Sequence, residues 1–131
     1  MSGEKDLEKL LRNMSPVLNE GEYVFITFSG NYGDCTYLEP IGSFEEKEGL
    51  TLIISKEKAI ENNIQVNDVF RFITLNVHST LNAVGLTAAV ASKLSSNDIS
   101  ANVIAAYYHD HIFVQSQHAE KALSLLLELT E

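Results

Sequence analysis

The chain has 131 residues, of which 18 are acidic and 9 basic, and its formal net charge is -9 at pH 7. No cluster of lysine and arginine could neutralise phosphates, so we expect neither nucleic acid nor a membrane surface as a partner. No run approaches the roughly 20 apolar residues that cross a bilayer. Cys35 is the single cysteine and no charged-then-apolar leader is visible, so we expect a cytoplasmic protein without an internal disulfide.

This length allows one compact domain, or two small ones that share a core. In the first half, leucines at helical spacing predict a helix over 4–13 that ends before Pro16, because the residue before proline avoids helical angles. The β-branched and aromatic run 23–28 predicts a strand, and the turn formers 29–34 after it predict a loop.

Two weaker runs, 36–44 and 50–54, predict an antiparallel pair joined by the polar stretch 45–49, in which Gly49 takes the left-handed angle of a hairpin. A helix over 56–62 should follow, capped by Ser55 and ended by the two asparagines at 62–63. Its spacing places Ala59 and Ile60 on the side that faces the core.

The second half begins with a predicted strand over 69–77 and a glycine-bearing turn at Gly85, which opens an alanine-rich helix. Leu86, Val90 and Leu94 stand one helical turn apart and should face the core. Two strands, 99–107 and 112–114, are expected to join around His109 and Asp110. Tyr107 and Tyr108 should lie on opposite faces of one strand, so that one is a core residue and the other lies near a partner or ligand. A last helix over 119–127 should be capped by Ser116 or Gln117.

The predicted order of strand, helix, strand, strand and helix is that of a ferredoxin-like βαββαβ sandwich without its final strand. The strand over 23–28 is the natural candidate to complete it. A strand that leads directly into a helix also leaves free backbone N–H groups at the start of that helix, and such groups suit a carboxylate. The sequence therefore favours a small anionic ligand near Gly85.

The runs 74–87 and 99–104 resemble the ACT domain, a ferredoxin-like module that senses amino acids. ACT modules typically carry an Asp-x-Pro-Gly turn, in whose place this chain has Asn82-Ala83-Val84-Gly85, and an entry into the second strand that corresponds here to Asp98-Ile99-Ser100-Ala101-Asn102-Val103. The glycine is kept, and the aspartate and proline are replaced. The whole chain resembles small stand-alone bacterial proteins that have two tandem ACT-like halves and no assigned function.

The resemblance implies an α+β fold with antiparallel sheets, helices on one face, and two ACT-like halves, 1–66 and 67–131, that share a core. It also implies a non-enzymatic regulatory protein without a cofactor, which binds an amino acid and forms a homodimer or a higher homo-oligomer. The predicted ligand-binding residues surround the glycine turn and the neighbouring strand: His78, Ser79, Asn82, Val84, Gly85, Leu86, Asn102 and Ile104.

Three alternatives remain open at the level of sequence. Gly85 can serve close packing of the helix instead of a ligand, and Asn82 removes the carboxylate that would balance an α-ammonium group. The chain would then be an interaction or dimerisation scaffold with a vestigial pocket. His109 and His111 share a strand face and could bind a metal, with His118 or Cys35 as a further ligand. Cys35 has no basic neighbour in sequence that would make it a nucleophile.

Overall fold

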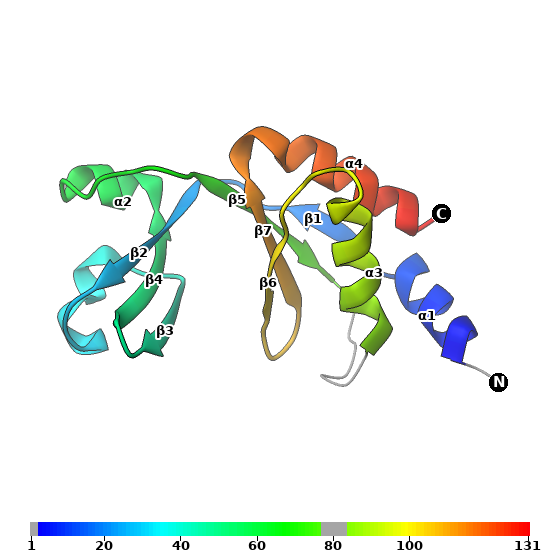
Figure 1. Cartoon of the computed structure of the whole chain (residues 1–131), viewed down its shortest axis with the longest axis horizontal. Coiled ribbons are helices and arrows are strands. Elements are labelled where there is room, and N and C mark those ends of the chain that lie inside the picture. The colour runs from blue at the N-terminus through cyan, green and yellow to red at the C-terminus, as the bar shows by residue number, and fades with distance from the viewer. Residues whose placement is uncertain (1–2, 77–83) are drawn as a thin grey trace. The chain divides into compact units, whose positions relative to one another are not determined.

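The structure, a computed structural model, describes residues 3–76 and 84–131. Contacts between Cα atoms divide the chain into two compact units. One unit, here called the discontinuous unit, combines the segment up to Glu20 with Arg71–Glu131; the other, the inserted unit, is Gly21–Phe70. Figure 1 follows the chain through both, and each unit is described below by itself.

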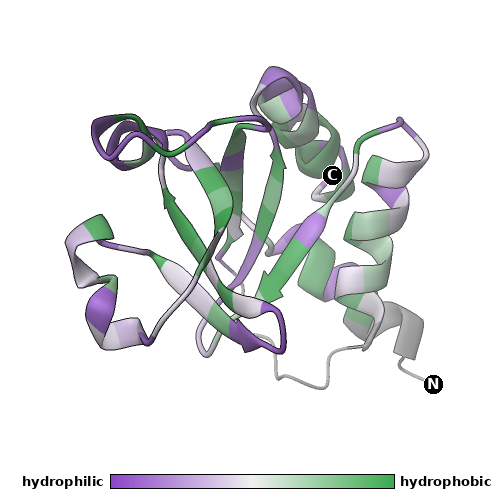
Figure 2. Cartoon of the chain, turned by 60° about the vertical axis from the view of Figure 1, so that its left-hand side comes forward, coloured by the Kyte–Doolittle hydropathy of each residue, from purple (hydrophilic) through white to green (hydrophobic). Residues whose placement is uncertain are grey.

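The inserted unit contains β2 (Tyr23–Phe28), two short 3-10 turns, η1 (Tyr32–Asp34) and η2 (Thr36–Leu38), the hairpin β3 (Gly42–Glu46) and β4 (Gly49–Ser55), and the helix α2 (Lys56–Glu61). Its strands follow the order β3-β4-β2, and both pairings are antiparallel. In Figure 2 the middle of β4 has hydrophobic colour and the β3–β4 turn is hydrophilic. The prediction of an antiparallel pair here is confirmed, although its first strand is shorter than expected because residues 36–38 form η2.

Alternate residues of β2 and β4 enter the hydrophobic cluster of the inserted unit, because successive side chains of a strand point to opposite faces. Ser55 caps α2 as predicted, since its Oγ accepts a hydrogen bond from the backbone N–H of Lys58 at 3.1 Å. The prediction for Ile60 is wrong: Ala59 is fully buried, whereas Ile60 is 58% exposed. The cluster comprises Val24, Cys35, Leu38, Leu50, Leu52, Ile54 and Ala59.

The discontinuous unit contains α1 (Gly3–Arg12), β1 (Pro16–Leu18), β5 (Phe70–Leu75, of which Phe70 belongs to the inserted unit), α3 (Val84–Ser95), the hairpin β6 (Asn102–Ala105) and β7 (Asp110–Gln115), η3 (Ser116–His118) and α4 (Ala119–Leu129). Strand β5 lies between β1 and β7, and β6 forms the edge beyond β7. The N-cap of α4 is His118, without a side-chain hydrogen bond, so the predicted capping by Ser116 or Gln117 is wrong.

The strand that completes this sheet is β1, and not the predicted strand over 23–28. Residues 16–18 pair antiparallel with Leu75, Thr74 and Ile73 of β5. With β1 in the place of the missing strand, the sheet order β1-β5-β7-β6 is that of a ferredoxin-like sandwich. The N-terminal segment thus supplies an edge strand to the unit formed largely by the C-terminal half.

The core of the discontinuous unit lies where the inward faces of β5 and β7 meet α3 and α4. The predicted inward residues Leu86, Val90 and Leu94 are all buried, which confirms the helical period over α3. Each unit thus has its own cluster of buried side chains in the described part of the chain. The members of this cluster are Met14, Ile73, Leu75, Leu86, Val90, Leu94, Ile99, Ile112, Val114, Ala119, Ala122, Leu125 and Leu126.

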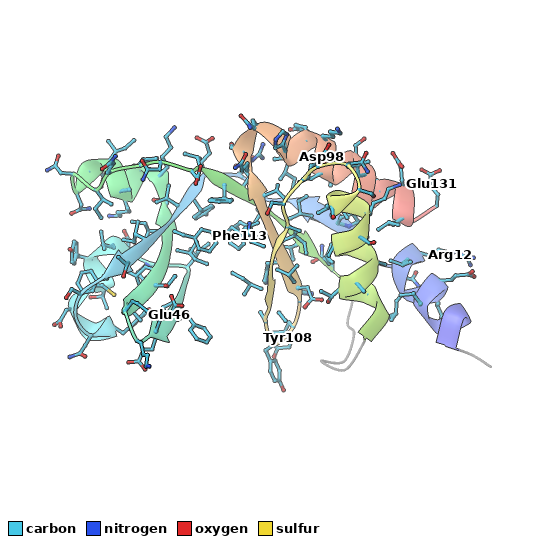
Figure 3. The ribbon with its side chains drawn as sticks, viewed as in Figure 1. Arg12, Glu46, Asp98, Tyr108, Phe113 and Glu131 are labelled. Carbon is cyan, nitrogen blue, oxygen red and sulfur yellow. The ribbon has the colours of Figure 1, made fainter. Side chains whose placement is uncertain are left out.

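The hairpin between β6 and β7 turns two residues earlier than predicted. The N–H of Ala106 donates to the carbonyl of His109 at 3.0 Å, so Tyr107 and Tyr108 form the tip. Their side chains are 84% and 68% exposed, and the rings meet edge to face with centroids 5.0 Å apart. Neither tyrosine is a core residue, which corrects the prediction that one would be. Figure 3 shows Tyr108 projecting from this tip.

The α+β ferredoxin-like fold expected from the sequence is confirmed by these antiparallel strands and the helices packed on them. In the described residues, no helix is both long enough and apolar enough to cross a membrane.

Candidate functional site

Of the predicted ligand-binding residues, Val84, Gly85 and Leu86 lie in the first turn of α3, and Asn102 and Ile104 lie on β6. His78, Ser79 and Asn82 lie outside the described residues. Val84 is the first residue of α3, so Val84 and Gly85 of the predicted turn are already helical, and the helix begins earlier than predicted. Because the first N–H groups of an α-helix have no partner within the helix, the backbone at this point can offer donors to an anion.

Gly85 is in close contact with α1. A Cβ atom at Gly85 would lie 3.0 Å from Cδ2 and 3.1 Å from Cδ1 of Leu7. Such distances are shorter than ordinary carbon contacts, so the absence of a Cβ at Gly85 is what allows α1 to approach α3 this closely. The side of Gly85 that faces α1 is therefore occupied by protein, as the packing alternative expects.

The remaining predicted residues have structural partners of their own. Leu86 is 1% exposed within the core, so its side chain is not available to a ligand in this structure. Asn102 starts β6, and its Nδ2 donates to the carbonyl of Phe113 at 3.1 Å. Ile104 is half-buried on the same strand, opposite His111. The eight residues remain a predicted ligand set.

A polar network that the sequence analysis did not identify lies on the sheet of the discontinuous unit. Asn19 Nδ2 donates to the carbonyl of Phe72 at 3.1 Å and to Thr74 Oγ1 at 2.8 Å. Thr74 Oγ1 in turn lies 3.0 Å from Nδ1 of His111. The backbone N–H of Asn19 also donates to Phe72 O at 2.9 Å, and Arg71 Nη2 donates to Asn19 O at 3.2 Å.

The network joins residues more than 30 positions apart in the sequence, so no local sequence motif predicts it. Because Thr74 Oγ1 accepts from Asn19, its own proton can be donated to Nδ1 of a neutral His111. Burial, followed by the charge of His109, lowers the pKa of His111 below its ordinary value, and Asp110 opposes this shift. Aromatic rings border the imidazole: the centroid of Phe72 is 5.8 Å from that of His111 and 4.8 Å from that of Phe113.

The metal alternative has no support among the residues that the structure describes. Within the described ranges, no group of three or more His, Cys, Asp or Glu side chains could hold a metal ion. His118 lies in η3. Cys35 is fully buried, and its Sγ donates to the carbonyl of Tyr32 at 3.1 Å. This thiol is part of the hydrophobic cluster of the inserted unit.

Two ACT domain models match the chain in tandem, one over residues 2–71 and the other over 68–128. The chain belongs to the ACT domain family. ACT domains are regulatory, non-catalytic modules that commonly bind small molecules, such as amino acids, and oligomerise. The family assignment made from the resemblance is confirmed.

Among solved structures, the chain is similar to a Vibrio cholerae protein of unknown function, described as a possible transport protein. The two share 53% identity over 99% of this chain and 100% of that one, with a TM-score of 0.91. A protein from Agrobacterium tumefaciens is 19% identical over 88% of this chain and 87% of that one, with a TM-score of 0.72. No functionally curated protein matches the chain.

The same fold occurs in the regulatory subunit of aspartate kinase from Thermus thermophilus, solved in its ligand-free form. That subunit is 10% identical over 91% of this chain and 99% of that one, with a TM-score of 0.63. At this identity the likeness shows the fold alone. The tandem family match is what defines this chain as a regulatory module.

Proposed function

We propose that the chain is a non-enzymatic, cytoplasmic regulatory protein that binds an amino acid and works as a homodimer or a higher homo-oligomer. The observation that carries this proposal is the match of two ACT domains in tandem along the chain. In the proposed division by sequence, residues 1–66 are one ACT-like half and residues 67–131 the other, with β1 of the first half pairing with β5 of the second. Binding would shift the equilibrium between assembled states, which is how a module without catalytic residues can regulate.

The proposed ligand site is the start of α3. The helix has 12 residues, long enough for a substantial dipole, and its first N–H groups would receive the ligand's carboxylate. Ser79 and Asn82, which precede the helix in the sequence, would contribute a hydroxyl and an amide. Because Asn82 has no charge, the ligand's ammonium group would bind carbonyl oxygens or an acid elsewhere.

Thermal unfolding in the presence of each proteinogenic amino acid tests the proposal. A ligand at 100 times its dissociation constant stabilises the folded state by about 2.7 kcal/mol. We expect one amino acid, or a small group of similar ones, to raise the midpoint, and the Asn82→Ala variant to lose this response. Ser100→Ala is the matched control, because Ser100 is an exposed polar residue outside the predicted set. If no amino acid raises the midpoint, the amino-acid role is wrong.

Sedimentation equilibrium tests the assembly part of the proposal separately. We expect the mass of a dimer or of a higher homo-oligomer, and a shift of that mass distribution when the stabilising amino acid is added. A monomer at every concentration, with and without the amino acid, would contradict the proposed oligomer. This measurement does not depend on which residues bind the ligand.

A scaffold role is the second candidate, and the contact of Leu7 with Gly85 favours it, because this contact fills space that a ligand would need on that side. The exposed pair Tyr107 and Tyr108 would be its docking residues, since tyrosine is enriched where proteins bind each other. If Tyr107→Ser/Tyr108→Ser abolishes self-association while the thermal response to amino acids stays absent, the scaffold role is supported over sensing.

A further inference from the structure

The inserted unit contains a cavity of about 260 Å³ that none of the predicted ligand-binding residues lines. Its walls come from the chain just before β2 and at the start of β2, and from the end of β4 together with α2. All of the wall belongs to the inserted unit, whereas the predicted ligand site belongs to α3 of the discontinuous unit. The lining residues are Gly21, Glu22, Tyr23, Ser55, Lys56, Glu57 and Ile60.

Charges of both signs face each other across this cavity wall. Lys56 Nζ lies 3.4 Å from Glu22 Oε1, and both side chains keep about two-fifths of their surface exposed. The backbone holds the two residues opposite one another, because the N–H of Lys56 donates to the carbonyl of Glu22 at 2.9 Å. An exposed ion pair of this kind contributes little stability by itself, so the charged groups of a ligand can replace each partner without a large loss.

Glu57 also lines the cavity. The lining residues therefore include one lysine and two glutamates. A ligand with only a carboxylate would bring its charge close to both acids, and a ligand with only an amine would bring its charge close to Lys56. A ligand that carries both groups can satisfy the two signs together.

An apolar surface completes the lining. Ile60 is 58% exposed, although its neighbour Ala59 in α2 is fully buried. The ring of Tyr23 lies over Gly21, with Cε2 and Oη each 3.4 Å from the point where a Cβ on Gly21 would be. Gly21 has φ +95°, a left-handed angle that a side chain would strain. The turn and the exposed isoleucine together provide contact area for a short aliphatic group.

We infer that this cavity binds a small zwitterion with a short aliphatic side group. Its carboxylate would pair with Lys56, its ammonium group with Glu22 and Glu57, and its aliphatic group would lie on Ile60 and Tyr23. A volume of about 260 Å³ is slightly below the range of roughly 300–1,000 Å³ that is usual for ligand pockets, as expected for a site that holds a small compound. This inference does not rest on the proposed function, because it concerns a different unit.

The test uses three probes of the same carbon skeleton: L-leucine, 4-methylpentanoate, which lacks the amine, and 3-methylbutylamine, which lacks the carboxylate. Each is titrated into the full chain labelled with ¹⁵N, and amide chemical shifts are followed. We expect leucine to shift the amides of Gly21, Tyr23 and Lys56 saturably, with a dissociation constant below about 10 mM. Each half-ligand should bind at least about tenfold more weakly, because it loses one charge-assisted contact.

Two variants and two matched controls assign the contacts. Glu22→Gln and Lys56→Gln should each weaken leucine binding about tenfold. Glu48→Gln and Lys47→Gln cause the same changes in net charge at the exposed β3–β4 turn and should leave binding unchanged. The amides of Gly85 and Asn102 report in the same spectra on the site near α3, so a response there and a response at Lys56 are separate results.

The inference is overturned if leucine causes no saturable shift at Gly21, Tyr23 and Lys56. It is overturned equally if either half-ligand binds as tightly as leucine, or if the turn variants weaken binding as much as Glu22→Gln and Lys56→Gln do. A response confined to Gly85 and Asn102 would support the proposed function and remove this second site.

Discussion

Leu7 Cδ2 lies 3.0 Å from the point that a Cβ atom on Gly85 would occupy. The contact joins α1, whose leucines Leu10 and Leu11 pack on the core of the discontinuous unit, to the first turn of α3. Glycine at this position therefore has a packing role, which does not depend on whether a ligand binds at the start of α3. This relationship makes the N-terminal helix part of the structure around the proposed ligand site.

We predict that Gly85→Val lowers the free energy of unfolding by about 1–3 kcal/mol, because its side chain overlaps both methyl groups of Leu7. Urea unfolding measures the change. The control Ala88→Val, at an exposed position of the same helix, should cost only about 0.5 kcal/mol through helix propensity.

The double variant Leu7→Ala/Gly85→Val separates overlap from other effects of the substitution. Removing the leucine side chain makes room for the valine, so Gly85→Val should cost much less in the Leu7→Ala background than in the natural chain. Equal costs in the two backgrounds would show that Leu7 does not set the requirement for glycine.

Asn19 bonds the chain to β5 just before the first segment of the discontinuous unit ends at Glu20. Its Nδ2 donates to Phe72 O and to Thr74 Oγ1, and both bonds are partly buried. We predict that Asn19→Ala costs about 1–3 kcal/mol of unfolding free energy, because Thr74 Oγ1 loses its donor and Phe72 O keeps only the backbone N–H of residue 19. Asn13→Ala is the control, since its Nδ2 bond to Lys9 O is exposed. Similar costs for the two variants would show that the network around Thr74 contributes no more stability than one exposed hydrogen bond.

The hydrophobic periodicity and the helix-capping residues of the sequence predict those helices and strands whose formation depends on neighbouring residues. The β-branched and aromatic run 23–28 is β2, and Ser55 caps α2 through the N–H of Lys58. In α3, the helical spacing of Leu86, Val90 and Leu94 correctly predicts that all three are buried. In each case the deciding interactions lie within one element or one turn, so a short window of sequence contains them.

The predictions from sequence are wrong where an element pairs with a segment that is distant in the sequence, or where both faces of a short element carry apolar residues. Strand β1 has three residues, and its identity depends on pairing with β5 over more than 50 positions. In α2, one turn and a half of helix cannot show which apolar residue faces inward, and Ile60 faces outward. The tip at Tyr107 and Tyr108 resembles a strand in composition, because tyrosine favours strands. The network of Asn19, Thr74 and His111 has no sequence signal.

The core of the discontinuous unit permits a direct test of packing. Leu94 is fully buried between the sheet and the helices, whereas Leu127 of α4 is 45% exposed. We predict that Leu94→Ala lowers the unfolding free energy by about 2–5 kcal/mol, since it removes buried methyl groups and leaves a cavity. Leu127→Ala should cost less than about 1 kcal/mol. The two variants remove the same atoms, so equal losses in urea unfolding would contradict the assigned burial.

His111 should make stability depend on pH between neutral and mildly acidic conditions. Burial and the charge of His109 lower its pKa in the folded state below the ordinary value of 6.5, so the unfolded chain binds the proton more tightly. Stability is therefore full above pH 6.5 and is lost as the pH falls from there through the folded pKa. We predict that His111→Asn flattens this part of the stability profile. NMR titration of the imidazole provides the direct check, and a midpoint at or above 6.5 would contradict the assigned direction.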